Sequence, residues 1–227
     1  MAVITISREV GSGGDQIARR LCELLGYRYF DKTLMAQVAR EQGVSDTEVV
    51  DFSEDSYRVR SFIDALLRRS TRIATATTVG TTTRGERTRL VQDVDEEMAA
   101  SFVRATIRAL RAYGRVVVVG RGGQAVLRDA TDVLHVRIVA RLEDRVHEVT
   151  QTEGLTREAA HTMIGERDRA TIEYLRRFHG IDWADPSLYH LTVNTSLLGR
   201  EAVADLLASV ARRMDARLPG LLPASAP

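Results

Sequence analysis

A cluster of glycines near the start of the chain has the residue types and spacing of a phosphate-binding loop. In the stretch "ITISREVGSGGDQIARRL", a β-branched run is followed by Gly11–Gly14 and then by a helical pattern beginning at Asp15. Such a turn points several backbone N–H groups at one spot, and the helix N-terminus adds partial positive charge, which together suit a phosphate. A tight turn that only connects a strand to a helix would use the same glycines, with Asp15 as a helix N-cap.

The lysine that usually accompanies such a loop is missing. When the pattern G-x-x-x-x-G-K-[ST] is aligned by its second glycine on Gly13, Arg8 falls on the first glycine and Gly14 on the lysine. Asp15 falls on the Ser/Thr position. Lys32 is the only lysine in the chain, so we expect an arginine to supply the loop's positive charge. Arg8 enters the same loop and is the first candidate.

A second candidate phosphate ligand follows four consecutive valines in "VVVVGRGG". Such a run predicts a parallel strand buried on both faces. Arg121 would then lie at the carboxyl edge of the sheet, where open α/β sheets bind ligands, and its guanidinium suits bidentate contact with phosphate. A surface arginine in a turn is the alternative.

Two arginine-rich helices are predicted at Arg141–Thr152 and Thr156–Phe178. Their arginines alternate with acidic residues, which is typical of a solvated helix carrying ion pairs. A lid that closes arginines over a phosphate would use the same residues. The histidines show no metal-ligand spacing, so we predict no protein-built metal site.

Strands alternate with helices along the chain, which indicates a parallel, three-layer α/β sheet. The charged segment 51–92 and its threonine-rich part 75–88 break this alternation, and the latter is predicted to be a loop. Residues 219–227 are expected to be a frayed tail. The predicted strands are Val3–Ile6, Tyr27–Phe30, Val116–Val119, Val133–Val139 and Tyr189–Asn194.

Composition favours a cytoplasmic protein without bulk attraction to nucleic acid or membranes. Of the 227 residues, 44% are hydrophobic and 28% charged, and the net charge is +1. The only cysteine, Cys22, leaves no internal disulfide. The N-terminus has no signal-peptide pattern, and no apolar run approaches the roughly 20 residues that span a bilayer. A nucleic-acid-binding patch is less favoured because a local basic face is more often solvated or ligand-facing; its residues would be Arg58, Arg60, Arg68, Arg69 and Arg72.

Five segments in this order resemble one family. They are "ITISREVGSGG", "YFDK", "VVVVGRGG", "LHVRIVA" and "DWADPSLYHLTVNTS", the last with the pattern W-x-D-P-x-x-Y-x-L-x-x-N-T. The chain is similar to the cytidylate kinase-like proteins among the P-loop nucleoside monophosphate kinases. The resemblance implies one domain over 1–227 with a three-layer P-loop NTPase-type core, an inserted helical acceptor-binding region at 32–92 and a helical lid at 141–178.

The resemblance also implies transfer of the γ-phosphoryl group of ATP, with Mg²⁺, to a nucleoside monophosphate, with CMP or dCMP favoured. It places acceptor phosphate on Arg121 and acceptor contacts near Asp31. Further lid arginines are implied to neutralise charge in the closed state, and two of them, Arg141 and Arg145, are implied to bind substrate. ATP phosphates are implied to contact Gly11, Ser12, Gly13, Gly14, Asp15 and Gln16, with Arg141, Arg145, Arg167 and Arg169 as the lid arginines.

Three departures from true cytidylate kinases leave the function open between two classes. Those enzymes have lysine and threonine where this chain has Gly14 and Gln16, and aspartate where it has Gly122. One class is an active kinase in which Arg8 replaces the lysine. The other is a nucleotide-binding regulatory module with little or no transfer activity. Apolar residues in 51–92 fit either the surface of a homo-oligomer or, as we favour, the core of the insertion.

Overall fold

A five-stranded parallel sheet forms the centre of the protein in our computed structural model, which describes residues 3–30, 100–101 and 103–216. The strand order is β2-β3-β1-β4-β5, and every neighbouring pair is parallel. The predicted parallel α/β class is therefore confirmed. The strands are β1 (Val3–Arg8), β2 (Arg28–Phe30), β3 (Val116–Val119), β4 (Val133–Val139) and β5 (Leu191–Asn194).

The central strands follow the hydrophobic pattern closely. All four valines of β3 are buried, as expected for a strand covered on both faces. β4 has the predicted bounds. β1 continues two residues past its predicted end, because Ser7 and Arg8 still pair with β4. This extension carries Arg8 to the point where the chain leaves the sheet.

The helices connect the strands and pack on the sheet. α1 ends where predicted: Gly26 has a φ of +64° and its N–H donates to the Cys22 carbonyl oxygen. The proposed N-cap role of Asp15 is wrong, because the left-handed residue before the helix is Gly13, and Asp15 lies inside the first turn. The helices are α1 (Gly14–Leu25), α6 (Gly123–Val126), α7 (Leu142–Glu153), α8 (Arg157–His179), α9 (Thr195–Leu198) and α10 (Arg200–Ala216), with a 3-10 turn at Pro186–Leu188.

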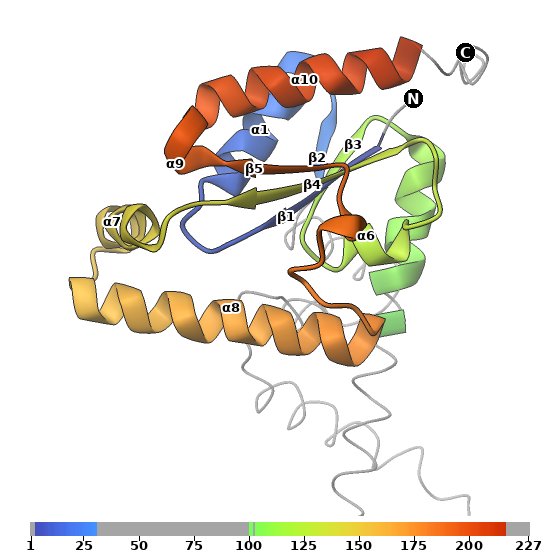
Figure 1. Cartoon of the computed structure of the whole chain (residues 1–227). Coiled ribbons are helices and arrows are strands. Elements are labelled where there is room, and N and C mark those ends of the chain that lie inside the picture. The colour runs from blue at the N-terminus through green and yellow to red at the C-terminus, as the bar shows by residue number, and fades with distance from the viewer. Residues whose placement is uncertain (1–2, 31–99, 102, 217–227) are drawn as a thin grey trace, which may run out of the picture.

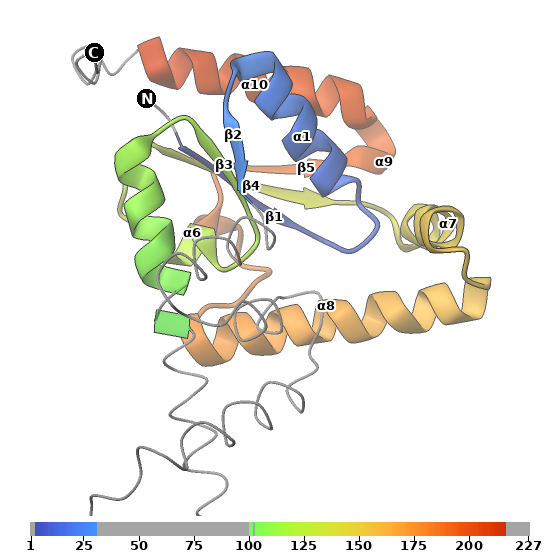
Figure 2. The same cartoon turned by 180° about the vertical axis from the view of Figure 1, so that it is seen from behind.

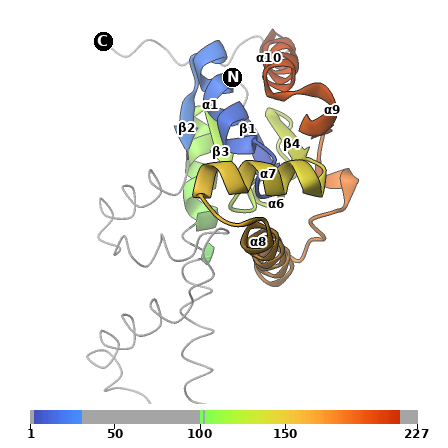
Figure 3. The same ribbon diagram turned by 90° about the vertical axis from the view of Figure 1, so that its left-hand side faces the viewer.

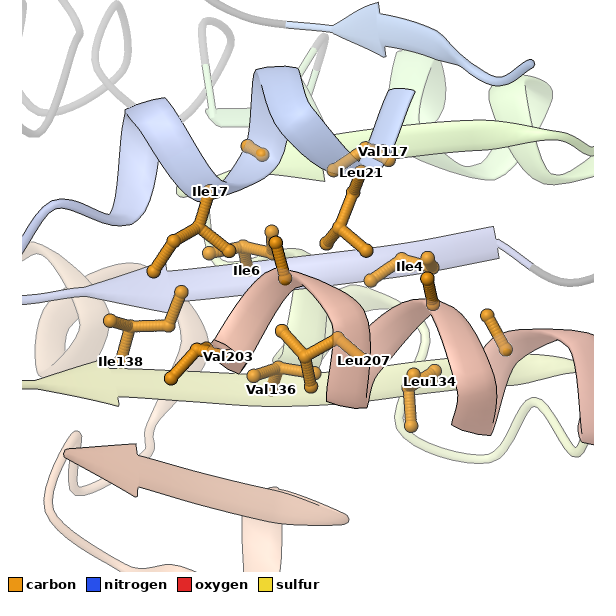
Figure 4. Packing of buried hydrophobic residues seen from close by; sticks show 14 of the residues in the cluster. Ile4, Ile6, Ile17, Leu21, Val117, Leu134, Val136, Ile138, Val203 and Leu207 are labelled. Atoms are coloured by element: carbon orange, nitrogen blue, oxygen red, sulfur yellow. The ribbon is translucent and has the colours of Figure 1, made fainter. Parts of the chain in front are cut away.

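Helices lie on both sides of the sheet (Figures 1 and 2). α1 and α10 cover one face, and α6, α8 and the helical residues 103–113 lie on the other. The core under α1 and α10 is aliphatic (Figure 4). Its members include Ile4, Ile6, Ile17, Leu21, Val117, Leu134, Val136, Ile138, Val203 and Leu207.

α7 lies beyond the carboxyl ends of the central strands (Figure 3). It follows β4 directly and runs into α8 through Gly154. The two predicted arginine-rich helices are thus present as α7 and α8. Their position beside the turn that follows β1 defines the edge of the sheet at which the candidate site lies.

Several predictions fall outside the described residues. These are Asp31, the proposed insertion at 32–92 and the tail at 219–227. No helix among residues 3–30, 100–101 and 103–216 is long and apolar enough to cross a membrane.

Candidate functional site

The turn between β1 and α1 has the backbone geometry of an anion-binding loop. Gly11 and Gly13 have φ values of +77° and +82°, and Gly13 directly precedes the helix. The N–H groups of the first helical turn have no intrahelical acceptor, and they point outward with the positive end of the helix dipole. Ser12 N–H donates back to the Glu9 carbonyl oxygen at 3.2 Å, which closes the turn.

Arg8 and Gly14 occupy complementary positions in this loop. A Cβ on Gly14 would lie 2.5 Å from the Arg8 Cβ and 2.7 Å from its Cγ. The missing side chain at the lysine position therefore makes room for the stem of Arg8. The guanidinium of Arg8 pairs with Asp15 through Nε at 3.5 Å, and the Tyr29 hydroxyl donates to the other Asp15 oxygen at 3.3 Å.

A pocket of about 480 Å³ opens over the loop. Its volume falls in the range of small-molecule sites, roughly 300–1,000 Å³. Arginines enter it from β1, α1 and α8, and carboxylates enter from the loop, α1 and α7. The lining residues are Arg8, Glu9, Val10, Gly11, Gly13, Gly14, Asp15, Gln16, Arg19, Glu148, Val149, Thr152, Glu153, Arg167 and Thr171.

α7 and α8 are attached to the loop by a buried ionic network. Arg145 donates through Nε to the Val10 carbonyl oxygen at 2.7 Å and pairs with Asp168 at 2.5 Å and with Glu9 at 3.4 Å. Asp168 in turn accepts from the Val10 N–H at 3.3 Å. We call these contacts the Glu9–Arg145–Asp168 network. Arg145, implied above to bind substrate, is placed here in contact with the protein's own carboxylates.

A second set of contacts joins α7 to α1 and α10. Glu148 accepts from the Gln16 side chain at 3.1 Å and pairs with Arg200 at 2.5 Å. The Arg200 side chain crosses Gly13, where a Cβ would lie 2.5 Å from its Nε. Sequence reasoning missed Glu148, Glu9, Asp168 and Arg200, because no motif marks them and their partners lie far away along the chain.

Arg121 lies in a turn with unusual backbone geometry. Gly120, Arg121 and Gly122 all have positive φ, and for Arg121 the value is +62°. A left-handed non-glycine residue is strained, and such strain is concentrated at functional positions. Arg121 is only 4% exposed and does not line the pocket over the loop. The imidazole of His179 fills the space beside Gly122, 2.5 Å from where a Cβ would lie.

The other predicted ligands divide between the pocket and its surroundings. Arg167 lines the pocket, whereas Arg169, two residues along α8, is exposed and does not. Arg141 is exposed at the N-cap of α7, and its N–H donates to the Ser196 hydroxyl at 2.9 Å. Ser12, within the loop, is buried, and its carbonyl oxygen accepts a hydrogen bond from the Thr195 hydroxyl.

The tryptophan-containing pattern has a structural role. The Trp183 indole N–H donates to the Ser7 hydroxyl at 2.6 Å, which ties the chain after α8 to the end of β1. The Arg137 guanidinium lies over the indole ring at 4.8 Å and donates to the Trp183 carbonyl oxygen. Tyr189 donates to the same oxygen at 3.0 Å. These contacts hold α8 beside the carboxyl edge of the sheet.

His135 is the histidine of the described residues whose pKa is shifted most clearly, and it lies outside the pocket. Burial, assisted by the neighbouring His190, lowers its pKa to about 4. Its Nε2 lies 3.2 Å from the Leu127 carbonyl oxygen and its Nδ1 lies 2.7 Å from the Thr5 hydroxyl. A carbonyl only accepts, so Nε2 carries the proton and Nδ1 accepts from Thr5. His135 is thus a neutral structural residue.

No group of three or more His, Cys, Asp and Glu side chains within the described part of the chain is arranged to hold a metal ion. The carboxylates nearest the loop are already paired, Asp15 with Arg8 and Glu148 with Arg200. Mg²⁺ needs only one or two carboxylates when substrate phosphates supply the remaining ligands.

A glycine loop at the carboxyl end of β1, with arginines over it, is the arrangement typical of phosphate-binding α/β proteins. The chain belongs to the cytidylate kinase-like family, whose model matches residues 3–197. This confirms the family resemblance seen in the sequence.

Curated relatives support this placement along nearly the whole chain. The cytidylate kinase of Aeropyrum pernix is 27% identical over 209 residues, covering 92% of this chain and 98% of that protein. The cytidylate kinase of Methanopyrus kandleri is 27% identical over 206 residues, covering 90% of both. The chain is thus homologous to cytidylate kinases.

A solved structure shares the fold. It is an uncharacterized protein from Eubacterium ventriosum, with a TM-score of 0.59 and 19% sequence identity, covering 93% of this chain and 99% of that one. At this identity the likeness concerns architecture alone.

Proposed function

We propose that the protein transfers the γ-phosphoryl group of ATP to a nucleoside monophosphate, with CMP or dCMP as the favoured acceptor. The observation that carries the proposal is the placement of Arg8 across Gly14 in the pocket over the loop. It puts a permanent positive charge in the loop that lacks the usual lysine. Homology to cytidylate kinases supports the reaction class and the acceptor.

In this mechanism the loop holds the β- and γ-phosphates on the N–H groups at the start of α1. Arg8 from β1 and Arg167 from α8 approach the phosphates and stabilise the negative charge that develops on the transferred phosphoryl group. An oxygen of the acceptor phosphate attacks the γ-phosphorus as the bond to the β-phosphate oxygen breaks, which yields ADP and a nucleoside diphosphate. Mg²⁺, when bound, neutralises charge on the phosphates.

Arg121 is the proposed ligand of the acceptor phosphate. It lies just beyond the carboxyl end of β3, next to β1, in a turn with left-handed backbone of the kind found at functional positions. Changing Arg121 to Ala should raise the KM for the acceptor by about tenfold or more while leaving ATP affinity within about twofold. Equal loss of ATP affinity would contradict this assignment.

A nucleotide-binding regulatory module remains the second candidate. It is favoured by Gly14 and Gln16 at the positions where cytidylate kinases carry lysine and threonine, and by the Asp15 carboxylate beside Arg8. This carboxylate offsets part of the positive charge that phosphoryl transfer requires. The two candidates differ in turnover, not in ATP binding.

The deciding experiment is a coupled ADP-release assay with Mg-ATP and, separately, CMP, dCMP, UMP, AMP and GMP. We expect ADP release that depends on one of the pyrimidine acceptors. Arg8→Ala should lower the rate by roughly 10²-fold, as loss of one electrostatic contact to a developing charge does. Arg213→Ala, an exposed arginine on α10, is the matched control and should match wild type. ATP binding without release for any acceptor would favour the regulatory module.

A further inference from the structure

We propose that Asp168 is a positioning residue of the phosphate pocket: by bonding to Val10 and to Arg145 at once, it fixes α8 over the loop and holds Arg167 in place. The inference rests on the proposed ATP site and identifies the residue that positions Arg167 within it. It concerns a residue that need not contact the nucleotide.

Both polar groups of Val10 that the loop could offer to a ligand are taken by α7 and α8. Its N–H donates to Asp168 Oδ1 at 3.3 Å and its carbonyl oxygen accepts from Arg145 Nε at 2.7 Å. One side chain from α7 and one from α8 are thus hydrogen-bonded to the same loop residue, Val10. Phosphate must then bind the N–H groups that follow, from Gly13 to Gln16, which lie nearer the start of α1.

Close packing shows that this attachment is built into the loop. A Cβ on Gly11 would lie 2.7 Å from the Arg145 carbonyl oxygen and 3.1 Å from its Cα. Those atoms belong to the backbone of α7 and cannot swing away as the end of a side chain can. Gly11 is therefore required both by its positive φ and by the approach of α7.

The charges of the network are largely buried: Arg145 lies between two carboxylates, and Arg137 lies 3.6 Å from Glu9 as a second cation. The side chain of Arg145 is 7% exposed, and those of Glu9 and Asp168 are 18% and 20% exposed. A buried guanidinium without its carboxylates would be strongly unfavourable, so the three groups hold one arrangement together. Glu9 also accepts from the Ala140 N–H at 3.2 Å, which ties the network to the end of β4.

Arg167 precedes Asp168 on α8, and successive helical residues leave the axis about 100° apart. Asp168 faces Val10, and Arg167 lines the pocket. Arg169, one residue further, is exposed. The rotation of α8 about its axis thus decides whether Arg167 reaches the pocket, and the Asp168 contacts fix that rotation.

A double-mutant cycle on ATP binding tests this inference. Asp168→Asn keeps the size of the side chain and removes its charge, and Glu166→Gln makes the same change at an exposed position of α8. With a fluorescent ATP analogue, we expect Asp168→Asn to weaken binding about tenfold, as Arg167→Ala should. If Asp168 acts through Arg167, the double variant is no weaker than Arg167→Ala alone. Glu166→Gln should bind as wild type does.

Other outcomes separate this inference from a purely structural role and from the proposed function. Effects that multiply in the double variant, or a lower Tm with unchanged ATP affinity, would overturn the positioning role. Unchanged hydrogen exchange of the Val10 amide in Asp168→Ala, which removes the accepting oxygen, would do the same without any nucleotide. Absence of ATP binding by the wild-type protein contradicts both proposals. ATP binding without transfer to any monophosphate contradicts the proposed function alone. The double-mutant cycle then still tests the role of Asp168, because it measures ATP affinity and not turnover.

Discussion

The aliphatic core under α1 and α10 and the Glu9–Arg145–Asp168 network are both buried, but they are built on different physical grounds. Apart from Tyr27, the buried side chains of the core are aliphatic, and their burial is favourable and largely independent of direction (Figure 4). The network contains three charges that are acceptable only in one mutual geometry. The first region supplies stability, and the second joins the loop to α7 and α8.

Substitutions in the core should therefore lower stability with little effect on nucleotide affinity, whereas substitutions in the network should lower both. A cavity in the aliphatic core should weaken packing without moving the loop, because the start of α1 is also held by the contacts of Asp15 with Arg8 of β1 and Tyr29 of β2. A missing charge in the network leaves its partners uncompensated and releases Val10. Four variants test this distinction, in order of decreasing expected effect.

The largest effect is expected from Arg145→Met, which keeps much of the side-chain volume and removes the cation that Glu9 and Asp168 share. Glu9 keeps its contact with Arg137 at 3.6 Å. Removing one partner of a buried pair costs about 3–5 kcal/mol. We expect urea unfolding to show a loss of that size and ATP affinity to fall as well. Arg157→Met, which removes an exposed arginine paired with Glu143, is the control and should cost under about 1 kcal/mol. Unchanged ATP affinity at a temperature where Arg145→Met is folded would contradict the comparison.

Leu207→Ala comes next. Leu207 is fully buried between α10 and the sheet, and a leucine-to-alanine change in such a core costs about 2–5 kcal/mol. The urea midpoint should fall accordingly, while the affinity of the folded protein for ATP stays within about twofold, since the core does not touch the pocket. Leu206→Ala, at an exposed neighbour on the same helix, serves as the reference. A large loss of ATP affinity in Leu207→Ala would show that the two regions are coupled.

Gly14→Ala should have a smaller effect, concentrated at the pocket. The added Cβ would overlap the stem of Arg8, and overpacking of this kind costs about 1–3 kcal/mol. Displacement of Arg8 should also weaken ATP binding. Gly165→Ala makes the same change on α8, where nothing lies within 4 Å of the new atom, so it should stabilise the helix by up to about 1 kcal/mol. Equal stability and equal ATP affinity of the two variants would contradict the interpretation that Gly14 makes room for Arg8.

The smallest effect concerns His135, a buried polar residue of β4 that is hydrogen-bonded to Thr5 of β1. Its pKa is lowered to about 4 in the folded protein from an ordinary value of 6.5. Between these values the unfolded chain binds the proton first, so stability should be full above about pH 6.5 and decline as pH falls toward 4. The decline is worth about 1–2 kcal/mol between pH 6.5 and pH 5, since one pKa unit corresponds to 1.36 kcal/mol.

His135→Gln should flatten this dependence of the unfolding free energy on pH, measured by urea titration at several pH values. His161→Gln, at an exposed histidine of α8, should leave it intact. A dependence that persists in His135→Gln would assign the titration to another group.

Much of the fold could be predicted because its signals are local. Four valines in a row specify a buried strand, and Gly26, in its left-handed conformation, ends α1 as predicted. The parallel sheet and the family also follow from the order of such segments. The N-cap assignment failed because helix initiation depended on the left-handed backbone at Gly13, which Asp15 does not adopt.

The candidate site was predictable in its backbone and only partly in its side chains. Gly11, Gly13 and Arg8 were expected in one loop, and they line one pocket. The partners of that loop were not expected: Asp168 lies 158 residues from Val10, and Arg200 crosses Gly13 from α10. Neither belongs to a local motif, and any of several charged residues on α7 and α8 fits the same helical pattern.

By itself, the sequence determined the strands, the glycine turn and the absence of a lysine from it, because hydrophobic periodicity and backbone freedom act over a few residues. Only the tertiary structure decided that Arg8 lies across Gly14, that Arg167 and not Arg169 reaches the pocket, and that Arg145 pairs with Glu9 and Asp168. Those choices depend on the distances and rotations between packed elements, and a charge becomes decisive only when burial brings one specific partner within reach.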